Sequence, residues 1–387
     1  MKNKIMISAV LATALFSTSA SADSLSDALK NGKVSGDVAV TYESREGETN
    51  TAGEYFEDTA YSVGSVGLNY ETAKYNNFSA NIGFRGYTDI WEDQDGDAGQ
   101  RLDTDERAVL KSAYIAYDTD IAHVKVGRQN ISTDWLTHDI DGVTAYITPF
   151  EKAELELIYA ARRGNIKSRD LVKFSDINGN DGLYQVGFTY AITDGTSAKA
   201  YTIKAKDLHD IYGAKLNYDA SKNDIGYGGF AHYMSIDQDD TTLEDGNMID
   251  IQAYVDINGW YTYAGYTTMD NNGGWGTAEN FGDIITQQEE GDYLYASWGF
   301  VANEVKYIGL SKNFAGIDLT LLYSMFDAKI DGSKGSATEF DIWAGYAFND
   351  DFRVDAGFTI VNQDDIFKTA AGTEDLTQLN ATFTYTF

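Results

Sequence analysis

Apolar and polar residues alternate along most of this chain, in runs of about 9 to 13 residues that Gly-rich or polar clusters separate. A period of two is typical of strands with one apolar and one polar face. The clearest apolar faces are Val34, Val38, Val40, Tyr42; Phe78, Ala80, Ile82, Phe84; Tyr184, Val186, Phe188, Tyr190, Ile192; Tyr212, Ala214, Leu216, Tyr218; Ile249, Ile251, Ala253, Val255; Ile317, Leu319, Leu321, Tyr323; Phe340, Ile342, Ala344, Tyr346, Phe348; and Phe352, Val354, Ala356, Phe358, Ile360. These faces predict a sheet with lipid on one side and water on the other.

The last residues alternate without interruption, and the chain ends on an aromatic side chain. Phe383, Tyr385 and Phe387 share one face, and Thr382, Thr384 and Thr386 share the other. A soluble sheet rarely ends on an exposed Phe, whereas the last strand of a membrane barrel is apolar outward and carries aromatics at the interface. We expect these three aromatics to be an assembly signal for the outer-membrane assembly machinery.

The first residues have the pattern of a secretory signal peptide. Lys2 and Lys4 precede the apolar residues 5–16, and the small residues Ala20 and Ala22 flank a cleavage site. That apolar run has about 12 residues and a transmembrane helix needs about 20, so a membrane would be crossed by strands. We predict a signal peptide at 1–22, a short periplasmic segment at 23–33 and a transmembrane β-barrel at 34–387.

Short and long connections alternate along the chain. Short ones near 71–77, 118–120, 149–151, 193–196, 220–223, 257–259, 313–316 and 349–351 are interpreted as periplasmic turns; those near 45–60, 89–106, 130–140, 163–182, 207–210, 236–248, 270–303, 328–337 and 364–374 are interpreted as extracellular loops. They predict an all-β antiparallel barrel of about eighteen strands, with sixteen as the alternative, and both termini periplasmic. Residues 293–301 also resemble a strand, but an even strand number places them in the long loop. Such a barrel is wide enough for an aqueous channel.

The amino-acid composition limits which classes of partner the protein can bind. The formal net charge is −31, which excludes nucleic acid as a natural partner and favours cations. The 27 Tyr and 19 Phe suit aromatic girdles against outer-membrane lipid and lipopolysaccharide. There is no Cys, so exported stability cannot come from disulfides.

The polar faces of the predicted strands supply candidate pore-lining residues. They are Asp37, Arg85, Glu154, Glu156, Arg162, Lys215, Asp250, Asp256, Asp318, Asp341 and Arg353, together with Glu43, Glu339 and Asp355. Acids outnumber bases, which raises the local concentration of cations in a pore with low-dielectric walls. The alternative is an unselective wet lumen in which these charges pair.

Residues 130–140 are the candidate constriction. They combine apolar Trp135 with Asp134, His138 and Asp139, and apolar side chains on a loop indicate packing against another surface, here the inner wall. Bases expected opposite the loop are Arg85, Arg107, Lys111, Lys125, Arg162 and Arg163. The alternative is an ordinary surface loop capped by Trp135.

Metal binding and catalysis have weak support. Asp93, Asp95 and Asp97 have the alternate spacing of calcium loops but lack the Gly and Glu of an EF-hand, so solvated loop charge is the stronger interpretation. The four His are scattered, and no Ser lies in a Gly-x-Ser-x-Gly elbow. We expect no cofactor and no enzymatic activity.

Two segments carry a family resemblance: residues 27–37 (DALKNGKVSGD) and 124–129 (VKVGRQ). Both resemble outer-membrane porins of epsilonproteobacteria, similar to the OprD-type family and its major outer membrane protein relatives. The resemblance implies an eighteen-stranded barrel, trimeric or monomeric, with an inward loop after the Gly-Arg-Gln segment and Arg128 facing the channel. Strict alternation with Val124 and Val126 would instead turn Arg128 to lipid, unless a bulge at Gly127 reverses its side. The acidic wall departs from the basic ladder of members that carry anions.

Together these patterns predict a passive outer-membrane channel for small hydrophilic solutes and ions, with a mild preference for cations. Two alternatives stay open: a substrate-specific porin, and a surface adhesin or coat protein in which the loops carry the function.

Overall fold

The computed structural model describes residues 22–47, 58–100, 102, 107–239, 244–270, 302–330, 333–371 and 375–387. Nearly all of its regular structure is antiparallel strand, as the alternation predicts. The strands are β1 (Lys33–Gly47), β2 (Thr59–Glu71), β3 (Phe78–Glu92), β4 (Ala108–Asp118), β5 (Ala122–Ser132), β6 (Thr137–Ile147), β7 (Ala153–Ile166), β8 (Leu171–Asp176), β9 (Leu183–Thr193), β10 (Thr196–Ala205), β11 (His209–Lys222), β12 (Ile225–Gln238), β13 (Gly246–Ile257), β14 (Trp260–Met269), β15 (Ala302–Phe314), β16 (Ile317–Ile330), β17 (Ser333–Ala347), β18 (Phe352–Gln363) and β19 (Leu376–Thr386).

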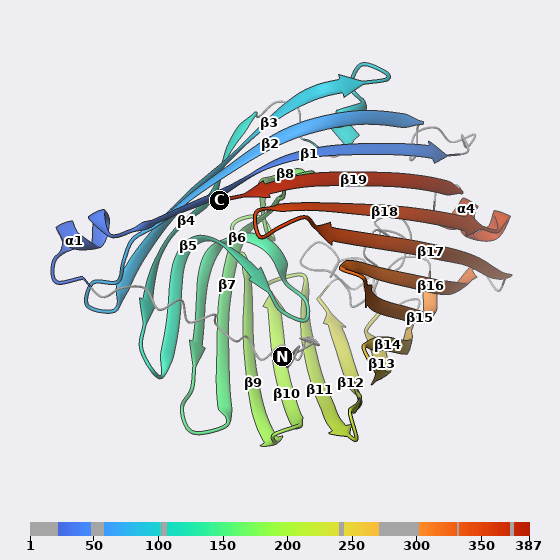
Figure 1. The fold of residues 1–387 in the computed structure, drawn as a ribbon. Helices are drawn as coiled ribbons and strands as arrows, with labels where there is room; N and C mark the ends of the chain where they lie inside the picture. Colours follow the sequence, from blue (N-terminus) through green and yellow to red (C-terminus); the bar gives the residue numbers. More distant parts are fainter. Residues whose placement is uncertain are drawn as a thin grey trace.

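Neighbouring strands close into a barrel (Figure 1). β1 pairs with β2 on one side and with β19 on the other, which completes the ring. β7 pairs with both β8 and β9, so β8 is a side branch and the ring consists of the other 18 strands. The predicted strand number is therefore confirmed, while β8 was not predicted. The strand-like residues 293–301 lie outside the described residues.

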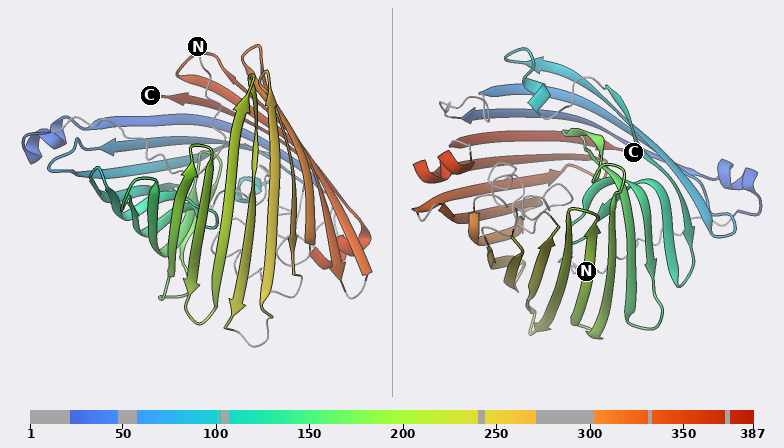
Figure 2. Two further views of the ribbon diagram at one scale, coloured as in Figure 1. Left: turned by 90° about the horizontal axis from the view of Figure 1, so that it is seen from below. Right: turned by 180° about the vertical axis from the view of Figure 1, so that it is seen from behind.

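The two ends of the barrel differ. The connections predicted to be periplasmic turns, the helix α1 (Leu25–Lys30) and the C-terminus lie at one end, here called the turn end (Figure 2). The helix is fixed there because Ala73 donates its N–H to Ala28 O at 3.1 Å. The 3-10 helix η1 (Asp97–Gln100) and the helix α4 (Asp365–Ala371) belong to longer connections at the opposite, loop end. No helix among the described residues is long and apolar enough to span a membrane.

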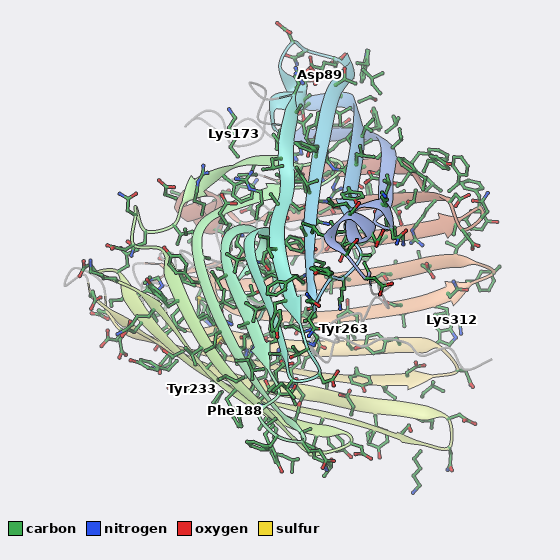
Figure 3. The ribbon with its side chains drawn as sticks, turned by 90° about the vertical axis from the view of Figure 1, so that its left-hand side faces the viewer. Asp89, Lys173, Phe188, Tyr233, Tyr263 and Lys312 are labelled. Atoms are coloured by element: carbon green, nitrogen blue, oxygen red, sulfur yellow. The ribbon has the colours of Figure 1, made fainter. Side chains whose placement is uncertain are left out.

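The outward faces match the alternation in the sequence. Val34, Phe78 and Tyr184 are exposed by 58%, 50% and 53%, and the aromatics Phe188 and Tyr233 also point outward (Figure 3). The inward positions between them are buried and largely polar, for example Thr41 and Glu43 of β1. This arrangement confirms a sheet with one apolar and one polar face.

The final strand closes the barrel as the C-terminal pattern predicts. Gly36 N–H donates to Phe387 O at 2.9 Å, and Phe387 N–H donates to Gly36 O at 3.0 Å. A Cβ at Gly36 would lie 2.6 Å from the Phe387 ring, so glycine is what allows this ring to lie over the first strand. The Tyr385 ring packs between those of Phe352 and Phe387, with centroids 4.6 and 6.0 Å away.

The ring is irregular between β4 and β5. Their pairing runs only from Asp118↔His123 to Ala113↔Arg128, although β4 and β5 extend farther, to Ala108 and Ser132. Beyond Arg128, β5 pairs with β6 alone, and the end of β7 pairs with β8. Figures 1 and 3 show these strand ends curving away from β4 into the barrel. Residues 128–141 and 162–176 are here called the inward flap.

Two glycines and a bulge mark the bend. Gly127 and Gly142 are cross-strand partners, and the register of β6 with β7 shifts between Asp141 and Gly142. Gly127 has φ of +125°, and a Cβ at Gly142 would lie only 2.0 Å from Tyr159 O. Because neither backbone position accepts a side chain, the three strands can turn together along this line.

Candidate functional site

One corner of the inward flap is the tight turn 133–136, which reaches the inner wall formed by β10 and β11. The Thr133 hydroxyl accepts the N–H of Leu136 at 2.8 Å and that of Trp135 at 3.2 Å, which fixes the turn. Trp135 and Leu136 are 2% and 0% exposed and belong to a cluster with Ile158 and Tyr201 of the wall. These apolar side chains therefore anchor the turn to the barrel.

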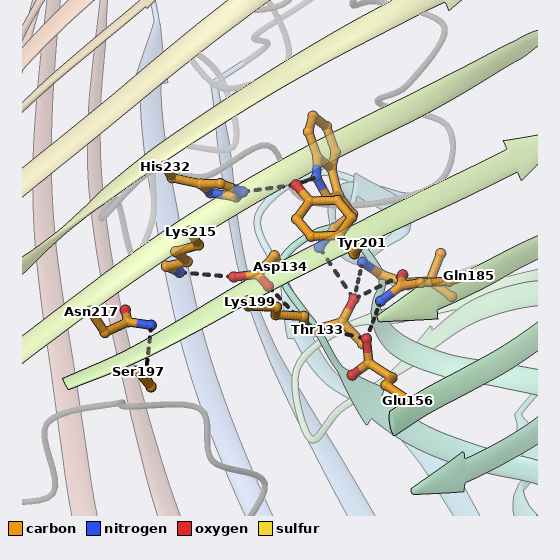
Figure 4. Close-up of polar contacts among 12 residues, drawn as sticks. Thr133, Asp134, Glu156, Gln185, Ser197, Lys199, Tyr201, Lys215, Asn217 and His232 are labelled. Atoms are coloured by element: carbon orange, nitrogen blue, oxygen red, sulfur yellow. Dashed lines mark hydrogen bonds and ion pairs between the residues drawn. The ribbon is translucent and has the colours of Figure 1, made fainter. Parts of the chain in front are cut away.

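Charge anchors the same turn. The Asp134 carboxylate pairs with Lys199 Nζ of β10 at 2.9 Å and with Lys215 Nζ of β11 at 2.8 Å (Figure 4). Lys199 also lies 3.3 Å from Glu156 Oε1, and Gln185 donates to that oxygen at 2.6 Å. All of these groups are largely withdrawn from solvent, so each charge depends on the others.

Aromatic and imidazole groups extend this network. Trp135 Nε1 donates to the Tyr201 hydroxyl, which lies 2.8 Å from His232 Nε2 (Figure 4). Lys199, Lys215, His232 and Asp250 are successive cross-strand partners on β10 to β13. The turn therefore faces one polar row that crosses four strands.

The pKa of Asp134 reflects its two lysines. Burial alone would raise the pKa of this carboxyl, but the charges of Lys215 and Lys199 outweigh burial and hold the pKa well below its ordinary value. Asp134 is therefore ionised at every physiological pH.

The other corner of the flap is the hairpin tip 167–170, which lies against different strands. The Tyr87 hydroxyl of β3 donates to Lys167 O at 2.8 Å, and Ile166 and Leu171 pack with Tyr87 in a second apolar cluster. The Arg169 guanidinium lies 5.9 Å from the Trp343 ring of β17. The flap thus crosses the lumen from β10 and β11 to β3 and β17.

The four residues predicted for the constriction lie in two different places. Asp134 and Trp135 meet the wall of β10 and β11, whereas His138 and Asp139 lie within the flap. His138 Nδ1 is 3.0 Å from Arg163 Nη2. Asp139 accepts from Asn130 at 3.2 Å and from Ile166 N–H at 2.9 Å. That this region narrows the pore stays a prediction.

Arg128 lies in the flap, although not for the reason the sequence suggested. The register of β5 with β6 is continuous through Gly127, so no bulge reverses the side of Arg128 in that pairing. The strand itself bends inward instead. Arg128 forms a fork with Asp141 at 2.7 and 2.8 Å, donates to Leu110 O at 2.8 Å and stacks 3.5 Å from the centre of the Phe174 ring.

Arg162 lies beside this group. It is 3.4 Å from Asp141 and 3.3 Å from Asp176, and it donates to Phe174 O at 2.8 Å. Arg128 and Arg162 therefore share the Asp141 carboxylate, and their charges are compensated within the flap.

The predicted pore-lining acids are less open to the lumen than their alternation implies. Asp250 and Asp341 are inward but fully buried, and they accept the hydroxyls of Thr267 and Thr359 at 2.9 and 2.7 Å. Asp256 accepts Gly259 N–H at 2.9 Å in a tight turn. The expectation that Asp250 faces water is therefore wrong, because neighbouring side chains cover it.

The remaining predicted residues form pairs or lie along the wall. Arg85 pairs with Asp37 at 2.5 Å and donates to Ser65 at 2.9 Å. Near the turn end, Arg353 lies 2.8 Å from Asp355 and 3.3 Å from Asp318. Glu154 is half-buried on β7, two residues before Glu156.

Sequence reasoning treated residues 163–182 as an ordinary loop and missed the tip 167–170. Apolar Ile166 and Leu171 flank four polar residues, which is the pattern of a short hairpin whose ends are buried. That pattern was a usable signal, but the wall that receives it can be found only in three dimensions.

The candidate calcium loop is used differently. Asp97 accepts the N–H groups of Ala60 at 2.9 Å and Gln94 at 3.2 Å, so its carboxylate ties the loop to β2. Within the described ranges, no group of three or more His, Cys, Asp or Glu is placed to hold a metal ion.

Comparison with known proteins identifies the class. Residues 49–280, more than half of the chain, match the model of a family described as "Putative outer membrane protein". The chain therefore belongs to this family, and we assign the protein to the bacterial outer membrane. No curated protein matches it.

Solved structures share the fold. Acinetobacter baumannii OccAB4 has a TM-score of 0.73 and 15% identity, covering 92% of this chain and 98% of that one. Pseudomonas aeruginosa OccK3 has a TM-score of 0.72 and 13% identity, covering 94% of this chain and 97% of that one. Acinetobacter baumannii OccAB3 has a TM-score of 0.73 and 13% identity, covering 92% and 100%. At these identities the likeness concerns the barrel architecture.

Proposed function

We propose that the protein is a porin: a water-filled channel for the passive diffusion of small hydrophilic solutes and ions across the outer membrane. The observation that carries this proposal is the closed barrel whose polar inner face is crossed by the inward flap. A barrel of this size leaves space for water, and the flap reduces that space without an energy source.

Planar-bilayer recording tests the proposal directly. The purified protein should insert in discrete, stable conductance steps in salt solution, and heat-unfolded protein from the same preparation should not. A folded barrel that produces no steps would contradict a channel and favour the adhesin or coat alternative.

The proposal includes a mild preference for cations, although two features act in opposite directions. The inner wall carries acids, of which Glu154 is partly exposed whereas Glu339 and Asp341 are buried. Lys111, Lys125 and Lys167, by contrast, form no ion pair with any residue that the structure describes, and Lys111 and Lys125 are inward. The whole-chain charge of −31 supports the cationic side. The reversal potential in a dilute salt gradient measures the balance, and an anion-selective value would contradict it.

Those lysines also support the second candidate, a substrate-specific porin. Lys111 lies among Arg85, Lys167, Asp139 and Asp37, so a small anion could compete with these two carboxylates for the bases where the flap meets the wall. A small dicarboxylate should then block ion current at lower concentration than a neutral sugar of similar size. Equal block by both solutes would leave the unspecific channel as the better description.

Export and assembly complete the proposal. We propose that residues 1–22 are removed on export, that both termini are periplasmic, and that Phe383, Tyr385 and Phe387 signal assembly. The resemblance of residues 27–37 and 124–129 supports an epsilonproteobacterial origin and a trimer or monomer. Deleting Phe387 should reduce the heat-modifiable folded band on unboiled gels, because Phe387 pairs with Gly36. Unchanged folding would contradict an assembly signal.

A further inference from the structure

We propose that Arg128 is a positioning residue that holds the inward flap against the barrel wall and thereby sets the width of the channel. This inference rests on the proposed channel function and deepens it. It concerns the place where the ring of strands is least continuous, between β4 and β5.

Arg128 stands at the point where the two strands separate. Ala113↔Arg128 is the last pair of β4 with β5, and the five residues of β4 from Ala108 to Ser112 have no partner on β5. Backbone ladders join the strands of an intact barrel wall, so this edge needs another contact. Arg128 Nη1 supplies one by donating to Leu110 O at 2.8 Å, three residues beyond the split.

The same side chain is fixed inside the flap. Its fork binds both oxygens of Asp141, at 2.7 and 2.8 Å, and its plane stacks on the Phe174 ring. A guanidinium can make all three contacts at once because its donors diverge in one plane, whereas an ammonium cannot. Arg128 therefore joins β4, β6 and β8, which the backbone does not join at this level.

The bend behind Arg128 gives the flap a line about which to move. Gly127 precedes Arg128, and its partner Gly142 follows Asp141, so both partners in the fork lie next to the bend. Small residues that absorb a change of backbone angle are the usual composition of a hinge. Loss of the Arg128 contacts would free the edge of the flap beside β4, while the turn 133–136 and the tip 167–170 keep their own contacts, and the lumen would widen at that edge.

Three variants separate positioning from charge. Arg128→Ala and Asp141→Asn both remove the fork but change the charge of the channel in opposite directions. Both should raise single-channel conductance by about twofold, with greater current noise, if a narrowing element leaves an otherwise wide lumen. The control is Lys306→Ala on β15, which also removes one positive charge. Lys306 pairs with Asp327 at 2.8 Å and with Glu304 at 3.1 Å and lies outside the flap, so this variant should leave conductance near that of the parent.

An engineered disulfide supplies a second measurement. Leu102, between β3 and β4, forms an isolated β-bridge with Leu171 of the flap. The natural chain contains no cysteine that could compete for the engineered pair. In the Arg128→Ala background, oxidising the double variant Leu102→Cys with Leu171→Cys should restore the parent conductance, and reduction should raise it again. Should Arg128→Ala not fold, Arg128→Lys keeps the charge without the fork and should shift conductance in the same direction.

Several outcomes would overturn the inference. Parent-like conductance and noise in Arg128→Ala or Arg128→Lys would show that Arg128 does not position the flap. Opposite changes in Arg128→Ala and Asp141→Asn would show an effect of charge alone. If no variant and no parent conducts, the porin function fails, and the rate at which the engineered disulfide between positions 102 and 171 forms, measured on gels, still decides the role of Arg128. That rate should fall in Arg128→Ala, and an unchanged rate would refute positioning.

Discussion

The wall from β11 to β19 and the wall from β4 to β7 obey the same alternation but form different structures. In the first, consecutive strands pair along most of their length, for example over 14 residues between β11 and β12. In the second, pairing of β4 with β5 stops after 6 residues, and the strand ends cross the lumen. The comparison shows that the alternation of apolar and polar residues determines the barrel. The glycines at the bend and the buried ion pairs determine which segment enters the lumen.

The largest expected difference between the two walls concerns their ion pairs. Asp134→Ala removes the partner of Lys199 and Lys215 and leaves two poorly solvated ammonium groups, so it should cost about 3–5 kcal/mol of unfolding free energy. Asp318→Ala in the regular wall removes an exposed pair with Arg353 and should cost about 0–1 kcal/mol. Urea unfolding of protein refolded into vesicles measures both. Similar losses would remove the energetic distinction.

The second comparison uses glycines. Gly142→Ala would place a Cβ 2.0 Å from Tyr159 O, a backbone atom that cannot move aside, and should cost about 1–3 kcal/mol. Gly86→Ala on β3 is the control, because its nearest contact would be Arg107 O at 3.6 Å. The same urea assay applies, and equal stability of the two variants would contradict a bend that requires glycine.

The contribution of Asp134 to the stability of the folded protein should decrease only at acidic pH. Its pKa is lower in the folded than in the unfolded protein, so its stabilisation is complete above the unfolded pKa of about 4 and is lost as pH falls toward the folded pKa. The stability difference between the parent and Asp134→Asn should be constant from neutral pH to pH 5 and shrink only below about pH 4. A difference that disappears between pH 7 and 5 would contradict the assignment.

The smallest effects concern selectivity. Lys111→Gln and Lys167→Gln remove charges that no described ion pair compensates, so the reversal potential in dilute salt should move toward cations. Asp250→Asn alters a buried carboxylate and should move the potential less, in the opposite direction. A larger shift from Asp250→Asn would show that the buried row, rather than the flap, sets the field.

The sequence predicted the regular wall better than the flap. Period-two alternation identifies faces such as Phe78, Ile82 and Phe84 because lipid contact acts on every second residue. The turn 133–136 could also be found, since Trp135 and Leu136 needed a surface to pack on. The sequence could not identify Lys199 and Lys215 as the partners of Asp134. A pairing across 65 or more residues depends on how the flap bends. The burial of Asp250 could not be predicted either, because alternation indicates which face of the sheet a side chain lies on but not how much of that side chain is exposed.

The junction of β1 with β19 has a consequence for biogenesis. The hydroxyls of Thr41 and Thr382 meet at 2.9 Å across 341 residues of chain, so the ring cannot close until its last strand is available. Contacts of such sequence separation form late, because nearly the whole polypeptide must first be ordered. A chain that is truncated before residue 376 would retain the unpaired edges of β1 and β18, which are open to aggregation and proteolysis. Closure by the final strand therefore also distinguishes complete from incomplete copies.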